Sequence, residues 1–214
     1  MRDWIGTIIA FLALITSFTV PIVILRKEYK NNVRLQLFEK RTEVLEKAIA
    51  ISCLTDRLKK EKNRIDKIDY YKISPNEMFL QVYTNDWLDY QQMCVSKQND
   101  TKPICNYLYN EKVNSEKLRA QCNYLFPEVY AQQLVEIFIS YIDFVSSLSE
   151  ACRIRENSYK SYLGTSEEQK VQALEAYKRS VVGPFNILAK NTDKLLSKIN
   201  ETNIDKIAKS YRLF

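Results

Sequence analysis

Few side chains in this sequence have the types and spacing needed for chemistry, and one such group lies between Arg153 and Lys160. Arg155, Asn157 and Lys160 fall there, just after the most apolar helical pattern of the polar part of the chain. Basic groups with this spacing could contact the phosphates of a nucleic acid. They would equally complement the negative end of a helix dipole. We favour the helix-end interpretation from the residues alone.

The composition excludes the commonest catalytic and metal sites. The sequence has no histidine, which removes the usual general base and the usual metal ligand. Its five cysteines form no Cys-x-x-Cys pair, and an odd, scattered set is typical of free thiols in a reducing compartment. Three glycines leave no phosphate-binding loop. We therefore expect a protein that is not an enzyme and holds no metal or cofactor, although a carboxylate- or lysine-based site stays open.

An apolar segment at residues 4–25 contains no charged side chain. A helix of that length spans about 33 Å, close to the hydrocarbon thickness of about 30 Å. The run ends on Ile22 to Leu25 and meets Arg26 and Lys27, a stop-transfer pattern rather than a signal-peptide cleavage site. The sequence therefore predicts one transmembrane helix over 4–25.

Basic residues gather on one side of this segment, because Arg26, Lys27, Lys30 and Arg34 follow it and only Arg2 precedes it. The positive-inside rule predicts a single-pass protein of the inner (plasma) membrane, with its N-terminus outside and its C-terminal part in the cytoplasm. We expect these four following side chains to contact lipid headgroups.

Small residues recur along one face of the apolar segment: Gly6, Ala10, Ala13 and Ser17. Such a stripe lets helix backbones approach closely in lipid. It overlaps a more polar heptad stripe of Asp3, Thr7, Ala10, Leu14 and Ser17. These residues predict packing between several copies, and a pore would require a ring of them. A lone anchor with incidental small residues remains an alternative.

The rest of the chain is predicted to be all-α. Residues 26–72 indicate a long juxtamembrane helix and a charged loop, and residues 73–214 a helical bundle that packs with 35–60 as one domain. Ser74 to Glu77 and Thr165 to Glu168 have the capping patterns of helix starts. Pro127 should open the central helix, whose Glu136, Asp143 and Glu150 mark a solvent edge. Gly183 and Pro184 should bend or break the helix that follows.

Arg155 and Lys160 also carry a family resemblance. Their spacing resembles a degraded Arg-x4-His element of HEPN ribonuclease domains, which are all-helical bundles of similar size, with Lys160 in place of the histidine. That resemblance implies an HEPN-like fold and argues against nuclease activity. With the N-terminal span and basic juxtamembrane helix, the layout resembles the small membrane accessory proteins of type VI-B, RNA-targeting CRISPR systems. That family implies an oligomeric membrane pore that augments antiviral defence.

We therefore expect a homo-oligomeric single-pass membrane protein, without enzymatic activity, that forms a pore or permeability device in antiviral defence. One alternative is a membrane-tethered scaffold that binds a cytoplasmic partner. Another is a degenerate HEPN-type RNA-binding or ribonuclease module. The expected partners are membrane lipid and further copies of the chain, with a cytoplasmic protein or RNA as further candidates. No small-molecule substrate is indicated.

Overall fold

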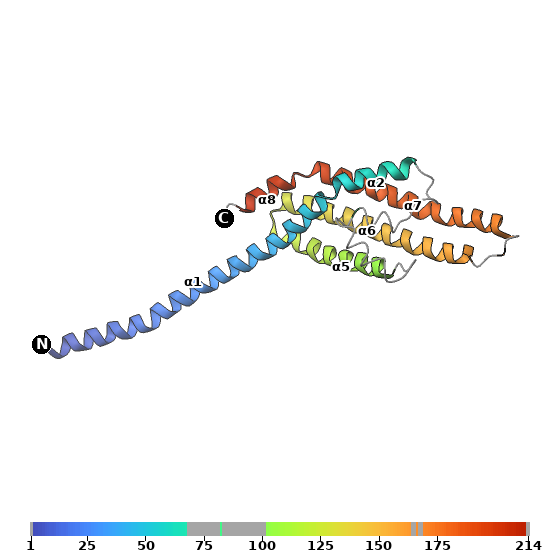
Figure 1. Ribbon diagram of the computed structural model, residues 1–214. Helices are drawn as coiled ribbons and strands as arrows, with labels where there is room; N and C mark the ends of the chain where they lie inside the picture. Colours follow the sequence, from blue (N-terminus) through green and yellow to red (C-terminus); the bar gives the residue numbers. More distant parts are fainter. Residues whose placement is uncertain (1, 68–81, 83–101, 164–165, 167–168, 213–214) are drawn as a thin grey trace. The chain divides into compact units, whose positions relative to one another are not determined.

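The structure, a computed structural model, describes the backbone of residues 2–67, 82, 102–163, 166 and 169–212 (Figure 1). Of residues 2–15, 18, 65–67, 102–103, 155–156, 159–163 and 212 it describes the backbone alone. The helices are α1 (Arg2–Ser52), α2 (Thr55–Lys67), α5 (Lys102–Leu125), α6 (Glu128–Leu163), α7 (Lys170–Glu201) and α8 (Ile204–Arg212). The all-α prediction is confirmed for these residues. The helix start predicted at Ser74 to Glu77 lies outside them, and of residues 68–101 only the buried Val82 is described.

The chain divides into two compact units, Met1–Glu43 and Val44–Phe214. Residues 2–43 of α1 belong to the first unit and residues 44–52 to the second. Val44 and Ala48 are fully buried, whereas Phe38 is 47% exposed. The part of α1 that packs in the core therefore begins at Val44, later than residue 35 where we expected it.

In the first unit, α1 continues without a break through Pro21. The helical backbone confirms the helix expected for residues 4–25 and its continuation into 26–52. In the part of the chain that the structure describes, no helix combines the length and hydropathy that a membrane crossing requires.

The core of the second unit forms around α6, which packs against both α5 and α7 (Figure 1). Its buried side chains recur at helical spacing and include Leu134, Phe138, Tyr141, Val145 and Leu148. Burying a large apolar side chain of this kind stabilises the fold by about 1.5–3 kcal/mol. The prediction that the helix after Pro127 is the central one is confirmed. Its first turn is an exception, because Val129 is 66% exposed.

The charged segment that begins at residue 56, predicted to be a solvated helix end and loop, is helical through Lys67, since α2 covers Thr55–Lys67. Its Leu58 is fully buried, and Lys62 forms a 2.6 Å ion pair with Asp193 of α7. Asp56, Lys59 and Lys60 are exposed on this amphipathic helix, whereas Glu61 is buried. Residues 68–72 lie outside the described part.

The helix α7 begins at Lys170 with Gln169 as N-cap and no side-chain cap. The capping pattern predicted at Thr165 to Glu168 lies outside the described residues except for Ser166. The helix continues through Gly183 and Pro184, so the predicted break is wrong. Proline inside a helix costs about 3 kcal/mol. Val181, Phe185 and Leu188, all buried around it, offset that cost by keeping the helix in the core.

Candidate functional site

The stretch Val20 to Leu25 of α1 is apolar and exposed on every side. Its exposed fractions run from 49% at Ile24 to 63% at Val23 and Leu25. Consecutive residues of a helix point in directions about 100° apart. Exposed apolar side chains at Ile22, Val23, Ile24 and Leu25 therefore surround the helix instead of forming one face. Contiguous exposed apolar surface of this kind marks a site that contacts lipid or another protein.

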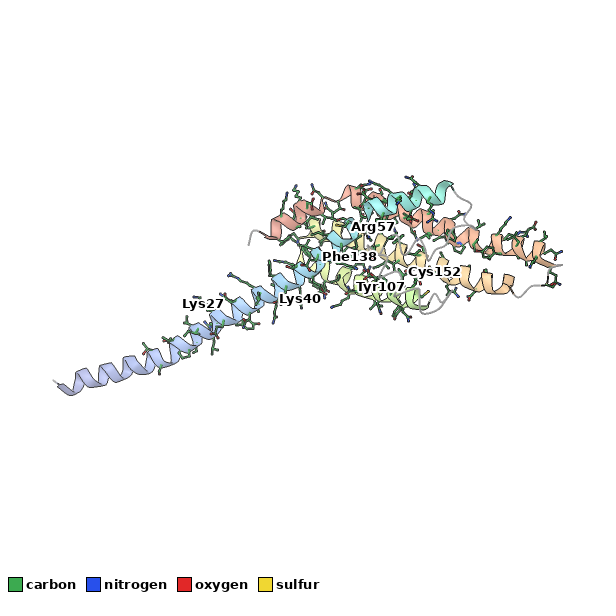
Figure 2. The ribbon with its side chains drawn as sticks, in the orientation of Figure 1. Lys27, Lys40, Arg57, Tyr107, Phe138 and Cys152 are labelled. Carbon is green, nitrogen blue, oxygen red and sulfur yellow. The ribbon has the colours of Figure 1, made fainter. Side chains whose placement is uncertain are left out.

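Basic side chains follow this apolar stretch directly. Arg26, Lys27, Lys30 and Arg34 are all exposed, and Lys27 extends outward from the helix in Figure 2. The sequence singled out these four residues as headgroup ligands, and that role stays a prediction. An apolar helical segment followed by cations has the order of groups found across one leaflet of a membrane, from acyl chains to headgroups.

The predicted packing residues all lie on the helical backbone of α1: Asp3, Gly6, Thr7, Ala10, Ala13, Leu14 and Ser17. Because that backbone is helical, Gly6, Ala10, Ala13 and Ser17 share one face as the spacing required. Ser17 is exposed, and only the backbone is described for the others. Their packing role remains a prediction.

The HEPN-like stretch lies within α6, where Arg155, Asn157 and Lys160 belong to one continuous helix. Asn157 is exposed, and the side chains of Arg155 and Lys160 lie outside the description. Near them, Ser158 of α6 and Ser180 of α7 are joined by a 2.9 Å hydrogen bond between their hydroxyl groups. The stretch of α6 that contains the motif therefore contacts α7 at Ser158.

A polar cluster that the sequence analysis did not anticipate joins α1, α5 and α6 around Glu111. The Lys47 ammonium and the Tyr141 hydroxyl both donate to Oε2 of Glu111, at 2.5 Å and 2.6 Å. The Lys47 ammonium also lies 5.3 Å from the centre of the Tyr141 ring, a cation–π geometry. Burial, with the Glu111 charge as a second cause, raises the pKa of Tyr107 on the same helix. The cluster joins three helices at one carboxylate.

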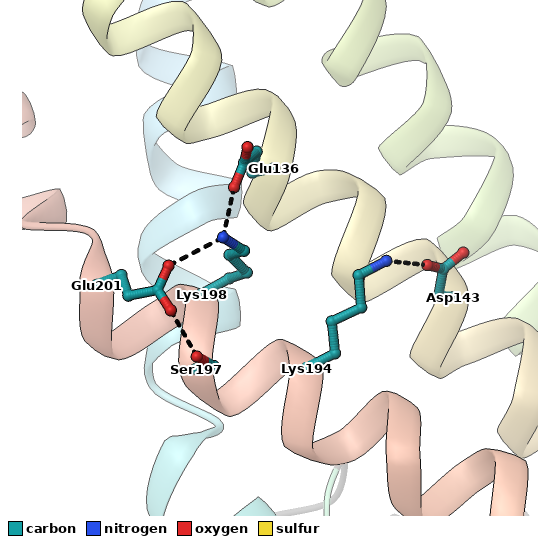
Figure 3. A network of polar contacts seen from close by, with 6 residues as sticks. All are labelled: Glu136, Asp143, Lys194, Ser197, Lys198 and Glu201. Atoms are coloured by element: carbon teal, nitrogen blue, oxygen red, sulfur yellow. Dashed lines mark hydrogen bonds and ion pairs between the residues drawn. The ribbon is translucent and has the colours of Figure 1, made fainter.

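A second set of polar contacts links α6 to α7 (Figure 3). Lys198 forms ion pairs with Glu136 at 2.7 Å and with Glu201 at 2.9 Å, and Lys194 pairs with Asp143 at 2.8 Å. Hydrogen bonds from Ser197 and then Lys198 lower the pKa of Glu201. Glu136 and Asp143, interpreted from sequence as a solvent edge, are indeed half-exposed and also tie the two helices together.

Helical spacing in the sequence could have predicted one contact of these clusters. Tyr107 and Glu111 are four residues apart on α5, a signal for a local pair. Lys47 and Tyr141 are distant in sequence, and their meeting at Glu111 depends on how three helices pack.

Both clusters are paired acids and bases with structural roles, and among the described residues no group of three or more potential metal ligands occurs. No protein-family model, curated protein or solved structure matches the chain.

Proposed function

We propose that this chain is a single-pass membrane protein whose helical bundle acts at the cytoplasmic face without catalysing a reaction. The observation that carries this proposal is the apolar surface of Val20 to Leu25, exposed on all sides of α1 and followed at once by exposed cations. Lipid can cover exposed apolar side chains on every side of a helix, whereas a protein partner would cover one face.

The magnitude of the insertion energy supports the proposal. Thirteen of residues 4–25 are Ile, Leu, Val or Phe. At about 0.3–0.6 kcal/mol each, they favour insertion by about 4–8 kcal/mol, before the smaller costs of the polar residues. The helical backbone of α1 pairs its own N–H and C=O groups, as lipid requires.

The orientation follows from the cations. Arg26, Lys27, Lys30 and Arg34 are exposed beyond the apolar stretch, and such a cluster is retained on the cytoplasmic side. The second unit, Val44–Phe214, follows in the chain and is proposed to lie in the cytoplasm.

We further propose that several copies associate through the small-residue face of α1, formed by Gly6, Ala10, Ala13 and Ser17. A ring of such copies would line a pore with the stripe from Asp3 to Ser17. The spacing of small residues on a helical segment supports both proposals. A role in antiviral defence is supported by the resemblance in layout to the accessory proteins of type VI-B systems. The scaffold alternative needs the anchor but no assembly.

Membrane insertion is tested by alkaline carbonate extraction of cell membranes. The wild-type chain should stay in the pellet. Leu12→Arg places a charge in the middle of the span at a cost of about 2.5–3.5 kcal/mol, so a large share should move to the supernatant. Tyr29→Arg is the matched control, because Tyr29 is 71% exposed and lies beyond the apolar segment. A wild-type chain that carbonate extracts completely would refute the proposal.

Pore formation is tested separately, by dye release from vesicles that contain the purified full-length chain. Ala10→Leu with Ser17→Leu should keep insertion and remove release, because bulky side chains prevent close helix approach. No release by the wild type would favour the tether over the pore, and equal release by both proteins would show that the pore does not depend on the small-residue stripe.

A further inference from the structure

The α1 segment from Arg26 to Lys40 carries charges of opposite sign on two different faces, and every residue in it is exposed. At about 100° per residue, Lys27, Lys30 and Arg34 fall within about 60° of each other. Glu28 and Glu39 fall within about 20° of each other, on a face about 140° away from the first. We call these the basic face and the acidic face. Among the described side chains, none of these five charges has an ion-pair partner.

Lipid headgroups can account for only part of this pattern. The headgroup layer is about 5–8 Å thick on each side of the hydrocarbon core. At 1.5 Å per residue, Lys27 and Lys30 lie about 3 Å and 8 Å beyond Leu25, whereas Arg34 and Glu39 lie about 13 Å and 21 Å beyond it. An acidic face also gains nothing from anionic lipid. The two faces together therefore need a partner that has both signs of charge.

A second copy of the same chain has those charges at matching heights. Copies inserted in one membrane stand parallel, so Lys27 and Lys30 of one helix lie level with Glu28 of its neighbour. Arg34 lies within about 8 Å of the height of Glu39, which two long side chains can bridge. Exposed apolar side chains border both faces: Leu37 and Phe38 beside the basic face and Leu35 beside the acidic face. The same contact would cover them.

We infer that the basic face of one copy binds the acidic face of the next copy along the juxtamembrane segment 26–40. Two different faces make a head-to-tail contact, so each copy has two neighbours. Because the faces are about 140° apart rather than opposite, repeated contacts curve and can close into a ring. The inference rests on the proposed membrane insertion, which holds the copies parallel, and it names the surface through which they meet.

Charge reversal tests the inference on the full-length chain in mild detergent, with particle mass measured by light scattering. One variant reverses the basic face: Lys27→Glu, Lys30→Glu and Arg34→Glu. A second variant reverses the acidic face: Glu28→Lys and Glu39→Lys. The control reverses three exposed lysines of α7 and α8: Lys190→Glu, Lys206→Glu and Lys209→Glu. Circular dichroism verifies that each variant keeps its helix content.

The wild type and the control should have a mass that is a multiple of the 25.2 kDa chain. Each face-reversed variant alone should dissociate at a concentration at least tenfold higher than the wild type, because both of its faces then carry the same sign. Co-expression of the two reversed variants should restore the wild-type mass, since the acidic copy can bind the basic copy. Raising the salt to 1 M should weaken wild-type assembly, because the Debye length falls to about 3 Å.

Three results would overturn the inference: a wild-type particle that is monomeric, a face-reversed variant that assembles like the control, or mixed variants that stay apart. Carbonate extraction of the same proteins separates this failure from failure of the proposed function. A monomeric wild type that stays in the carbonate pellet would contradict the proposed interface and support the membrane anchor. A wild type that carbonate releases would contradict the anchor and, with it, the parallel arrangement of the copies.

Discussion

Replacing Glu111 with leucine should destabilise the bundle more than any exposed charge change. Glu111→Leu removes the acceptor of both the Lys47 ammonium and the Tyr141 hydroxyl. Breaking a buried ion pair by removing one partner costs about 3–5 kcal/mol. Here the side chains of Lys47 and Glu111 are 18% and 17% exposed, so water still reaches the ammonium. We therefore expect a somewhat smaller loss of about 2–4 kcal/mol.

The size of the effect can be measured by thermal unfolding. In a chain of this length, 1 kcal/mol shifts the Tm by about 2–4 °C. The Tm of the full-length chain in mild detergent, followed by circular dichroism, should therefore fall by about 5–15 °C. Lys47→Met combined with Glu111→Leu should lose less than the single change, because no unpaired ammonium remains and the pair is replaced by apolar groups of similar size.

The control for this experiment is the ion pair of Glu175 and Arg179 on α7. Its atoms are 3.7 Å apart and its side chains are 64% and 84% exposed. Such pairs are worth about 0–1 kcal/mol, so Glu175→Leu should change the Tm by no more than about 4 °C. If Glu111→Leu lowers the Tm no further than this control, the Glu111 cluster does not hold the three helices together. Additive effects of Lys47→Met and Glu111→Leu would show that the two side chains act independently.

Three further predictions concern single residues. Gly183→Ala should raise the stability by about 0.5–1 kcal/mol, measured as a higher Tm, because an added Cβ meets no atom within 4 Å and alanine is the better helix former. Glu201, whose pKa is lowered in the folded state, should contribute stability above its ordinary pKa of 4.5 and lose it as the pH falls through the lowered value. The Tm profile of Glu201→Gln should lack that part of the acid-side decline, and identical profiles would count against it. A maleimide at pH 7.5 should modify the exposed Cys53 well before Cys122, whose pKa burial raises to about 12; equal rates in peptide mapping would contradict this order.

Periodicity predicted the helices of the core well, because each buried face follows from where its apolar residues recur. Leu134, Phe138, Tyr141 and Leu148 recur at helical spacing and are all buried on the core side of α6. Local signals of helix ends performed less well. Pro184 was expected to end or bend a helix that in fact continues, because burial of the residues around it outweighs the local cost. At α2, mixed charges indicated a helix end and loop, and the helix in fact continues through Lys67.

The contacts between helices in the two polar clusters could not be predicted from the sequence. Glu43 and Lys47 have the spacing of a local pair, yet the Lys47 ammonium binds Glu111 of a different helix. Nothing near Lys47 in the sequence points to that partner, because the contact exists only after α1 and α5 have packed together. In the same way, the seven-residue spacing of Glu136 and Asp143 placed them at the edge of α6. It did not show that Lys198 and Lys194 of α7 would lie opposite.

The contrast between the two units indicates where function should be sought. In the second unit, charged side chains such as Lys47, Lys198 and Asp143 bind partners on neighbouring helices, so the structure accounts for them as contributors to the fold. In the first unit, the exposed apolar residues Val20 to Leu25 and the charged faces of segment 26–40 contribute nothing comparable to the fold. Contiguous exposed apolar surface of this kind marks a contact site rather than a contribution to the fold. The proposed membrane anchor and the proposed contact between copies both use side chains of this unit, so substitutions in residues 20–40 test both proposals most directly.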